Sequence, residues 1–261
     1  MSKTALITGA SSGIGKEMAI LHASRGGNLV VIARSVRKLN ELKEELEAKY
    51  NSSVYVIKKD LTLPNAAKEV YEEVTQNKIA VNYLINNAGF GGQGLFHERD
   101  WNDDLSMIQL NIIALTALTR YFLPDFVKRN EGRVLNVSST ASLMPGPLQA
   151  VYFATKAYVT SFSNAISEEL NNTNITVTAL LPGATETQFA KTSGMDKTDL
   201  FAKTYSATKV AKTGYEGMLA GKLNVKAALS FSQRIMMSSV PFVPKKMLLK
   251  QIREMQETKE N

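Results

Sequence analysis

A tyrosine and a lysine four residues apart are the side chains in this sequence best suited to move a proton. Tyr152 and Lys156 bracket the stretch Tyr-Phe-Ala-Thr-Lys, and residues four apart in a helix lie on one face. A tyrosine phenol has a pKa of roughly 10 in water, and a neighbouring ammonium favours the phenolate and lowers that pKa. The spacing therefore predicts a proton donor for a carbonyl oxygen near neutral pH, provided that another group supplies a hydride.

A glycine-rich segment near the N-terminus indicates a dinucleotide as the source of that hydride. The segment follows the apolar run Thr4–Thr8 and opens a predicted helix, with the spacing GxxxGxG. Glycine permits a tight turn and lets the backbone approach a pyrophosphate at a helix N-terminus. A turn with a purely structural role is the alternative. The residues expected to bind the cofactor here are Gly9, Ser11, Ser12, Gly13, Ile14 and Gly15.

The ends of the second and third predicted strands bear on the choice of cofactor. Enzymes that use NAD usually place an acidic residue after the second strand, where it holds the ribose 2′-hydroxyl. This chain has Arg34 there, and a guanidinium suits a 2′-phosphate. We therefore expect NADP(H), with a solvated strand-end arginine as the alternative. Asp60 and Leu61 follow the third strand, and Asp60 could bind the adenine amino group or simply form a turn.

Apolar runs that alternate with helical periodicity predict an α/β fold with one doubly wound parallel sheet, a Rossmann fold, and helices on both faces. The expected strands are Thr4–Thr8, Asn28–Ala33, Val54–Lys58, Tyr83–Asn86, Arg133–Val137, Ile175–Leu181 and, more weakly, Asn224–Ser230. No linker divides the sequence, so we expect one domain over residues 1–261. Residues 185–214 are polar and rich in threonine and lysine, which suggests a substrate lid. Residues 244–261 predict a basic C-terminal helix with Met247, Leu248, Ile252 and Met255 as an apolar stripe.

Composition excludes several classes of protein. The chain has no cysteine, which rules out a disulfide framework and a thiol nucleophile. No signal peptide is apparent, and apolar runs such as Ile112 to Leu118 are far shorter than a membrane span. We therefore expect a cytoplasmic protein without an integral membrane segment. The net charge of +7 lies in residues 191–261, which hold 13 basic and 6 acidic residues. A solvated face, an anionic substrate and a membrane surface are all compatible with it, whereas nucleic acid is not expected.

Six motifs in order resemble the short-chain dehydrogenase/reductase family, in its single-domain branch, and bacterial ketoacyl-reductase-like members in particular. Thr8 to Gly15 is similar to TGxxxGxG, and residues 86–89 to the NNAG that closes strand four. Asn111, Ser139 and the Tyr152/Lys156 pair match the family's catalytic residues. Pro182, Gly183 and Thr187 match the PGxxxT after strand six. The resemblance runs from Lys3 to at least Gly217.

The resemblance implies a role for each matching residue. Tyr152 would be the general acid in reduction or the base in oxidation, and Lys156 would lower its pKa and hold the nicotinamide ribose. Ser139 would hydrogen-bond the substrate oxygen, and Asn111 would hold a water that links Lys156 to solvent. The family's remaining cofactor contacts fall on Asn87, Ala88, Gly89, Pro182, Gly183 and Thr187. A homodimer or homotetramer is also implied.

Three ambiguities accompany these assignments. Ser138 and Ser139 point to opposite faces of a strand, and the spacing to Tyr152 favours Ser139. Tyr205 and Lys209 repeat the YxxxK spacing, but no strand-end serine precedes them, so we interpret them as a decoy. His22 and His97 are isolated, which predicts packing or surface roles and no metal site.

The expected activity is NADPH-dependent reduction of a ketone or ketoacyl group, with a tyrosine as general acid. The alternatives are an NADP-dependent alcohol dehydrogenase that works in the oxidative direction, and a catalytically inactive NADP-binding sensor. Residues 90–94, 143–149 and 185–214 are expected to select the substrate. Their apolar members suggest a hydrophobic ketone or an acyl chain, although core packing explains each of them equally well. These members are Met144, Leu148, Phe189, Met195 and Phe201.

Overall fold

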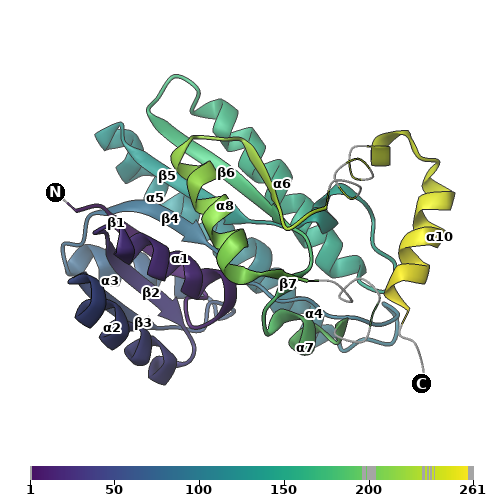
Figure 1. Cartoon of the computed structure of the whole chain (residues 1–261), viewed down its shortest axis with the longest axis horizontal. Helices are drawn as coiled ribbons and strands as arrows, with labels where there is room; N and C mark the ends of the chain where they lie inside the picture. The colour runs from purple at the N-terminus through teal and green to yellow at the C-terminus, as the bar shows by residue number, and fades with distance from the viewer. Residues whose placement is uncertain are drawn as a thin grey trace.

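Seven parallel strands form the sheet on which the rest of the chain is built in this computed structural model (Figure 1). The structure describes residues 2–195, 198, 204–230, 233, 235, 237 and 239–257. The strands are β1 (Thr4–Thr8), β2 (Asn28–Ala33), β3 (Val54–Lys58), β4 (Val81–Asn86), β5 (Gly132–Val137), β6 (Ile175–Pro182) and β9 (Asn224–Ala227). Their order across the sheet is β3-β2-β1-β4-β5-β6-β9. The predicted doubly wound fold is confirmed, and each predicted strand begins within two residues of its expected start.

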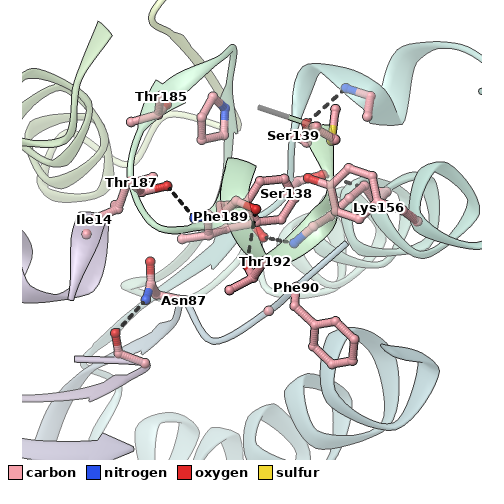
Figure 2. A pocket seen from close by; sticks show the side chains of 18 of the residues that line it. Ile14, Asn87, Phe90, Ser138, Ser139, Lys156, Thr185, Thr187, Phe189 and Thr192 are labelled. Atoms are coloured by element: carbon pink, nitrogen blue, oxygen red, sulfur yellow. Dashed lines mark hydrogen bonds between the residues drawn. The ribbon is translucent and has the colours of Figure 1, made fainter. Parts of the chain in front are cut away.

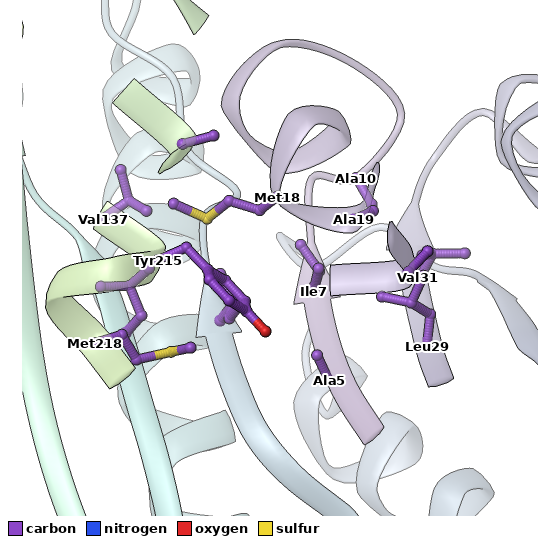
Figure 3. Packing of buried hydrophobic residues seen from close by; sticks show 14 of the residues in the cluster. Ala5, Ile7, Ala10, Met18, Ala19, Leu29, Val31, Val137, Tyr215 and Met218 are labelled. Carbon is purple, nitrogen blue, oxygen red and sulfur yellow. The ribbon is translucent and has the colours of Figure 1, made fainter. Parts of the chain in front are cut away.

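Helices cover both faces of the sheet. The long helices that alternate with the strands are α1 (Gly13–Ser24), α2 (Val36–Tyr50), α3 (Ala66–Gln76), α4 (Trp101–Ile108), α5 (Leu115–Arg129), α6 (Ala150–Glu169) and α8 (Ala207–Leu219). Consecutive strand residues point to opposite faces, so Ile7 packs with α1, α2 and α8 while Leu6 packs with α3 and α5. Figure 3 shows the first of these cores, where Met18 of α1 and Tyr215 of α8 meet above the strands.

Helix α2 illustrates how the sequence fixes this arrangement. Leu39, Leu42 and Leu46 recur at helical spacing and are fully buried against the sheet, while the charged residues between them face solvent. The helix ends at Tyr50, and Asn51 follows it in the left-handed conformation that asparagine tolerates.

A continuous helix runs from Trp101 to Arg129, because a π-helical segment, η1 (Gln109–Ala114), joins α4 to α5. It is long and apolar enough to cross a membrane by length and composition alone, and 39% of its most apolar window is buried. Phe122 and Phe126 of this helix pack in the core against the sheet. Core helices of soluble proteins meet the same length and composition criteria, so the match is weak support for a span.

The remaining elements surround the carboxyl ends of the strands. They are η2 (Thr140–Leu143), β7 (Thr185–Glu186), α7 (Phe189–Ser193), β8 (Tyr205–Ser206), η5 (Val240–Phe242) and α10 (Lys245–Gln256). The predicted lid at 185–214 is too long, because α8 begins at Ala207 and packs Val210 and Ala211 into the core. The predicted C-terminal helix is present as α10 within the described residues.

Candidate active site

One large cavity, of about 1010 Å³, opens at the carboxyl ends of the strands. It includes the crevice between β1 and β4, where the strand order reverses and where open α/β sheets bind ligands. Figure 2 shows Ile14 and Asn87 on one side of this cavity and Ser139 and Lys156 on the other.

The glycine turn forms the floor of the cavity between β1 and α1. Gly9 has φ +67°, and a Cβ added there would lie 2.8 Å from Asn87 Nδ2. Asn87 Nδ2 in turn donates to the Thr8 carbonyl at 2.9 Å, which ties the turn to the end of β4. Only glycine fits this conformation and this close contact. The bare backbone beside a helix N-terminus is the arrangement that holds a pyrophosphate.

Two basic side chains line the cavity beyond β2. Arg34 follows the strand, and Lys38 lies one helical turn further on in α2. No carboxylate ends β2, so the group bound here is expected to carry extra negative charge, as a 2′-phosphate does. Sequence reasoning missed Lys38, although its spacing of four residues from Arg34, in the first turn of a predicted helix, was a usable signal.

Asp60 also lines the cavity and shapes the loop after β3. Its Oδ1 accepts hydrogen bonds from Thr62 N at 3.0 Å and from Thr62 Oγ1 at 2.8 Å. Burial raises the pKa of the Asp60 carboxyl, but the bonds from Thr62 and the charge of Arg34 outweigh it and hold the pKa below its usual value. Asp60 therefore forms a turn through Oδ1, and its contact with the adenine amino group stays a prediction.

Tyr152 and Lys156 meet in the cavity as the four-residue spacing predicts. Lys156 Nζ lies 5.8 Å from the centre of the Tyr152 ring and donates to the Val137 carbonyl of β5 at 2.9 Å. Both side chains are buried and line the cavity. A side-chain hydrogen bond links Tyr152 to Ser139, the residue two beyond the end of β5.

The protonation of this pair differs from the sequence expectation. Burial raises the pKa of the Tyr152 phenol to about 12, and the hydrogen bond with Ser139 lowers it by a smaller amount. Burial also lowers the pKa of Lys156 to about 8. The expected lowering of the Tyr152 pKa by Lys156 is wrong for this geometry. Burial of the phenol disfavours its charged form and is the largest influence on the Tyr152 pKa.

The two adjacent serines have different partners. Ser138 Oγ lies 2.9 Å from the Lys156 carbonyl and 2.7 Å from Thr160 Oγ1, so it braces α6 against β5. Ser139 accepts from Ala141 N at the start of η2 and bonds Tyr152. The structure thus places Ser139, as expected, beside the phenol.

Asn111 lies behind the cavity lining, in the π-helical segment η1. Its Nδ2 donates to the Phe90 carbonyl at 2.9 Å and to Thr155 Oγ1 at 3.1 Å, and its Oδ1 accepts from Phe90 N. The side chain therefore links the loop after β4 to α6. A water-holding role can use only the second lone pair of Oδ1 or the backbone carbonyl. A π-helical turn in an α-helix is frequently found at functional sites.

The expected nicotinamide side of the cavity is also assembled. Six predicted residues from the loop after β4 and from the end of β6 and the segment that follows it line it together, namely Asn87, Ala88, Gly89, Pro182, Gly183 and Thr187. A Cβ added at Gly89 would lie 2.9 Å from Asn111 Oδ1 and 3.3 Å from Lys156 Nζ. Gly15 is the one predicted cofactor residue that does not line the cavity, because it packs behind the turn against Gly9 and Asn87.

The second Tyr-Lys pair and the histidines lie outside the cavity lining. Lys209 Nζ lies 5.9 Å from the centre of the Tyr205 ring, but Lys209 is exposed and neither residue lines the cavity. His22 is buried, with Nδ1 2.7 Å from Tyr215 Oη, and His97 is exposed. Among the described residues no group of acidic or histidine side chains could hold a metal ion.

The end of the cavity beyond Tyr152 is apolar. Its lining includes Phe90, Met144, Phe153, Phe189, Met195, Leu248, Ile252 and Met255. Leu148, which was expected here, does not line it, and Phe201 lies outside the described residues. Sequence reasoning missed the contribution of η5 and of α10, because nothing local in a sequence tells which distant element closes a cavity.

The chain is similar to several known proteins. The profile of the short chain dehydrogenase family matches residues 3–198. The NADP-dependent 3-hydroxy acid dehydrogenase of Schizosaccharomyces pombe is 36% identical over 190 residues, which is 72% of this chain and 73% of that protein. The very-long-chain 3-oxoacyl-CoA reductase of Mus musculus is 29% identical over 225 residues, 85% of this chain and 72% of the relative. A solved short-chain dehydrogenase from Sphingobium yanoikuyae in complex with NADPH superposes with a TM-score of 0.83 at 30% identity, covering 98% of this chain and 99% of that one.

Proposed function

Because the chain belongs to the short-chain dehydrogenase family, we propose that it is an NADPH-dependent carbonyl reductase in which Tyr152 donates the proton. The family and the oxidoreductase class predicted from the motifs are confirmed. The observation that carries the proposal is the meeting of Ser139, Tyr152 and Lys156 in one cavity with the glycine turn.

The cofactor is assigned as NADP(H), in agreement with the sequence expectation. One relative is named NADP-dependent, and the similar solved structure holds NADPH. The residues present fit this dinucleotide. The Gly9 turn provides a cradle that any side chain would fill, and Arg34 and Lys38 line the end where a 2′-phosphate would lie. Bound NADPH supplies the hydride, and the protein supplies orientation and electrostatics.

The side chains account for the proton half of the reaction. Ser139 and Tyr152 are placed to donate hydrogen bonds to a carbonyl oxygen, and such donors stabilise the negative charge that develops there. Tyr152 then gives its proton to that oxygen, which becomes a hydroxyl group. Lys156, held by the Val137 carbonyl, stabilises the phenolate that remains. Asn111 fixes the loop at Phe90 and is a positioning residue.

The raised pKa of Tyr152 is compatible with a proton donor in reduction. A Tyr152 pKa of about 12 keeps the phenol protonated at neutral pH, which is the state a general acid needs. Reduction leaves a phenolate and oxidation starts from one, so burial makes that form costly in both directions and the charge of Lys156 is needed to stabilise it. The apolar end of the cavity supports a bulky ketone or an acyl chain as the substrate.

The test is a matched pair of variants. Tyr152→Phe removes the proton donor, whereas Tyr205→Phe makes the same change in the second Tyr-Lys pair, outside the cavity. NADPH oxidation is measured with ketones, 3-oxoacyl thioesters and steroids, and NADPH binding is measured by fluorescence. We expect a loss of at least about 100-fold in turnover for Tyr152→Phe alone, with NADPH binding kept. Unchanged turnover in that variant would refute the assignment, and the absence of turnover in the native enzyme would favour a sensor.

We also propose that the protein works in the cytoplasm as a homo-oligomer. The absence of cysteine suits a reducing compartment. The helices that carry Asn111 and Tyr152 expose apolar side chains, among them Ile113 and Tyr158. An Ile113→Lys variant that stays a dimer or tetramer in light scattering would place the interface elsewhere.

A further inference from the structure

The C-terminal part of the chain has an uncommon charge distribution. Residues 217–253 hold seven basic residues and no acidic one. Three of these cations, Lys245, Lys246 and Lys250, lie on the N-terminal half of α10 and are exposed. Within the described residues none of the three has a carboxylate partner, whereas Arg253 near the end of the helix pairs with Glu257. The three lysines therefore form a positive surface, in which Glu254, one helical turn after Lys250, is the nearest carboxylate along the helix.

The same half of the helix exposes large apolar side chains. Phe242, the last residue of η5, is 86% exposed, and Met247 is 54% exposed. Leu248 and Ile252 form the inner stripe of α10 and are buried in one cluster with Met107 and Phe153. The packing of the helix is therefore already satisfied by its inner stripe. Phe242 and Met247 remain in solvent beside the lysines, and we call these five residues the η5–α10 surface.

The chemistry of this surface selects among partners. A second copy of the chain packed on the same face would bring lysines against lysines. A nucleotide or another soluble anion would use the lysines but leave Phe242 in water. An anionic bilayer satisfies both, because its surface attracts basic side chains and its interior accepts apolar ones. We propose that the η5–α10 surface binds anionic membranes peripherally, without a span.

The position of the surface connects membrane binding to the cavity. The elements that carry it also line the same end of the cavity, through the apolar Val240, Val243 and Met255 and the polar Gln251. Met255 is both part of that lining and 39% exposed, so it lies at the rim of the cavity. An apolar ketone dissolved in the bilayer would then enter beside α10. This entry route rests on the proposed function, whereas the membrane binding does not.

The binding is tested by co-sedimentation of the full-length protein with vesicles of phosphatidylcholine alone or with phosphatidylserine. We expect binding to the anionic vesicles only, and weaker binding at high salt. The triple variant Lys245→Gln, Lys246→Gln, Lys250→Gln should lose affinity by roughly 100-fold, since one basic residue near such a surface contributes about fivefold. Phe242→Ser should weaken binding separately.

Matched controls carry the same chemical changes elsewhere. Lys209→Gln, Lys212→Gln and Lys222→Gln together remove the same charge from exposed positions on and after α8. Phe96→Ser removes a comparably exposed aromatic ring from the loop before α4. Neither control should change vesicle binding. Equal losses in the controls would show a general charge or hydrophobicity effect and would overturn the proposal.

Two further outcomes also overturn it. One is a native protein that co-sediments no better with vesicles that contain phosphatidylserine than with phosphatidylcholine alone. The other is a lysine variant that binds vesicles normally but shows a raised KM for a soluble acyl thioester, which would assign the lysines to an anionic substrate. The vesicle assay needs neither cofactor nor turnover. A protein without reductase activity can therefore still support the membrane surface, and an active one can refute it.

Discussion

Replacing Lys156 with methionine should stabilise the protein while it abolishes the activity. The lysine is 5% exposed, and burial lowers its pKa from 10.5 to about 8. A difference of about 2.5 pKa units corresponds to about 3 kcal/mol, because one unit is about 1.4 kcal/mol. At pH 7 the folded state must hold the charged form, so this energy is subtracted from the stability. Methionine cannot make the hydrogen bond to the Val137 carbonyl, and this loss costs about 1 kcal/mol. The variant should therefore be more stable than the native protein by about 2 kcal/mol.

The sign of the pH dependence separates this cause from better packing. Between the folded pKa of about 8 and the unfolded value of 10.5, the unfolded chain binds more protons than the folded one. The stability contributed by Lys156 is therefore lowest below pH 8 and rises up to about pH 10.5. Methionine does not titrate, so it contributes no such pH dependence to the stability. The advantage of Lys156→Met should be about 2 kcal/mol at pH 7 and should shrink or reverse near pH 10.

Urea unfolding followed by circular dichroism at pH 7 and pH 9.5 measures the difference. NADPH oxidation in the same preparations should be lost, because the phenolate of Tyr152 has no cation beside it. A control, Lys209→Met, changes an exposed lysine and should alter stability by less than about 0.5 kcal/mol. A variant that is less stable than the native protein at pH 7, or whose difference does not change with pH, refutes the reasoning.

Three other predictions follow from the site. In the native enzyme kcat/KM for ketone reduction should fall about tenfold for each pH unit above about 8, as Lys156 loses its proton; an unchanged rate up to pH 10 would contradict the assignment. Arg34→Asp should raise KM for NADPH by at least about tenfold more than KM for NADH, since it places a like charge beside the 2′-phosphate, and equal rises would show that Arg34 does not discriminate. Gly9→Ala should weaken NADPH binding measured by titration calorimetry, because its Cβ would lie 2.8 Å from Asn87 Nδ2. The control is Gly26→Ala, where the added Cβ meets nothing within 4 Å, and it should change folding stability only.

The strands of the sheet were predictable because the physics is local. A parallel strand buried on both faces must be apolar along its whole length, and the run Leu29–Ile32 satisfies this with no exposed residue. The glycine turn was predictable for a similar reason, since a positive φ at Gly9 excludes nearly every other residue. A local structure is predictable from the sequence where its conformation or its environment admits only a few residue types.

The electrostatics of the site could not be predicted in this way. The spacing of Tyr152 and Lys156 predicted their meeting, and the structure places them together. Whether burial or the neighbouring charge controls the Tyr152 pKa depends on how Phe153, Phe189 and α10 close around the pair, which is a property of the assembled fold. Which of the two serines lies beside the Tyr152 phenol was likewise shown only by their hydrogen-bond partners in the structure.

Because α10 lines the cavity, the residues that would carry out the reaction and many of those that would contact the substrate lie in different parts of the chain. The residues that would handle the proton and hold the cofactor all lie before position 188, within the family match at 3–198. Much of the apolar wall comes from residues 240–255, after that match ends. An exchange of residues 240–257 between relatives could therefore redirect the enzyme to a new molecule while its reaction stayed the same. Substrate choice and proton chemistry would then be changeable independently in this chain.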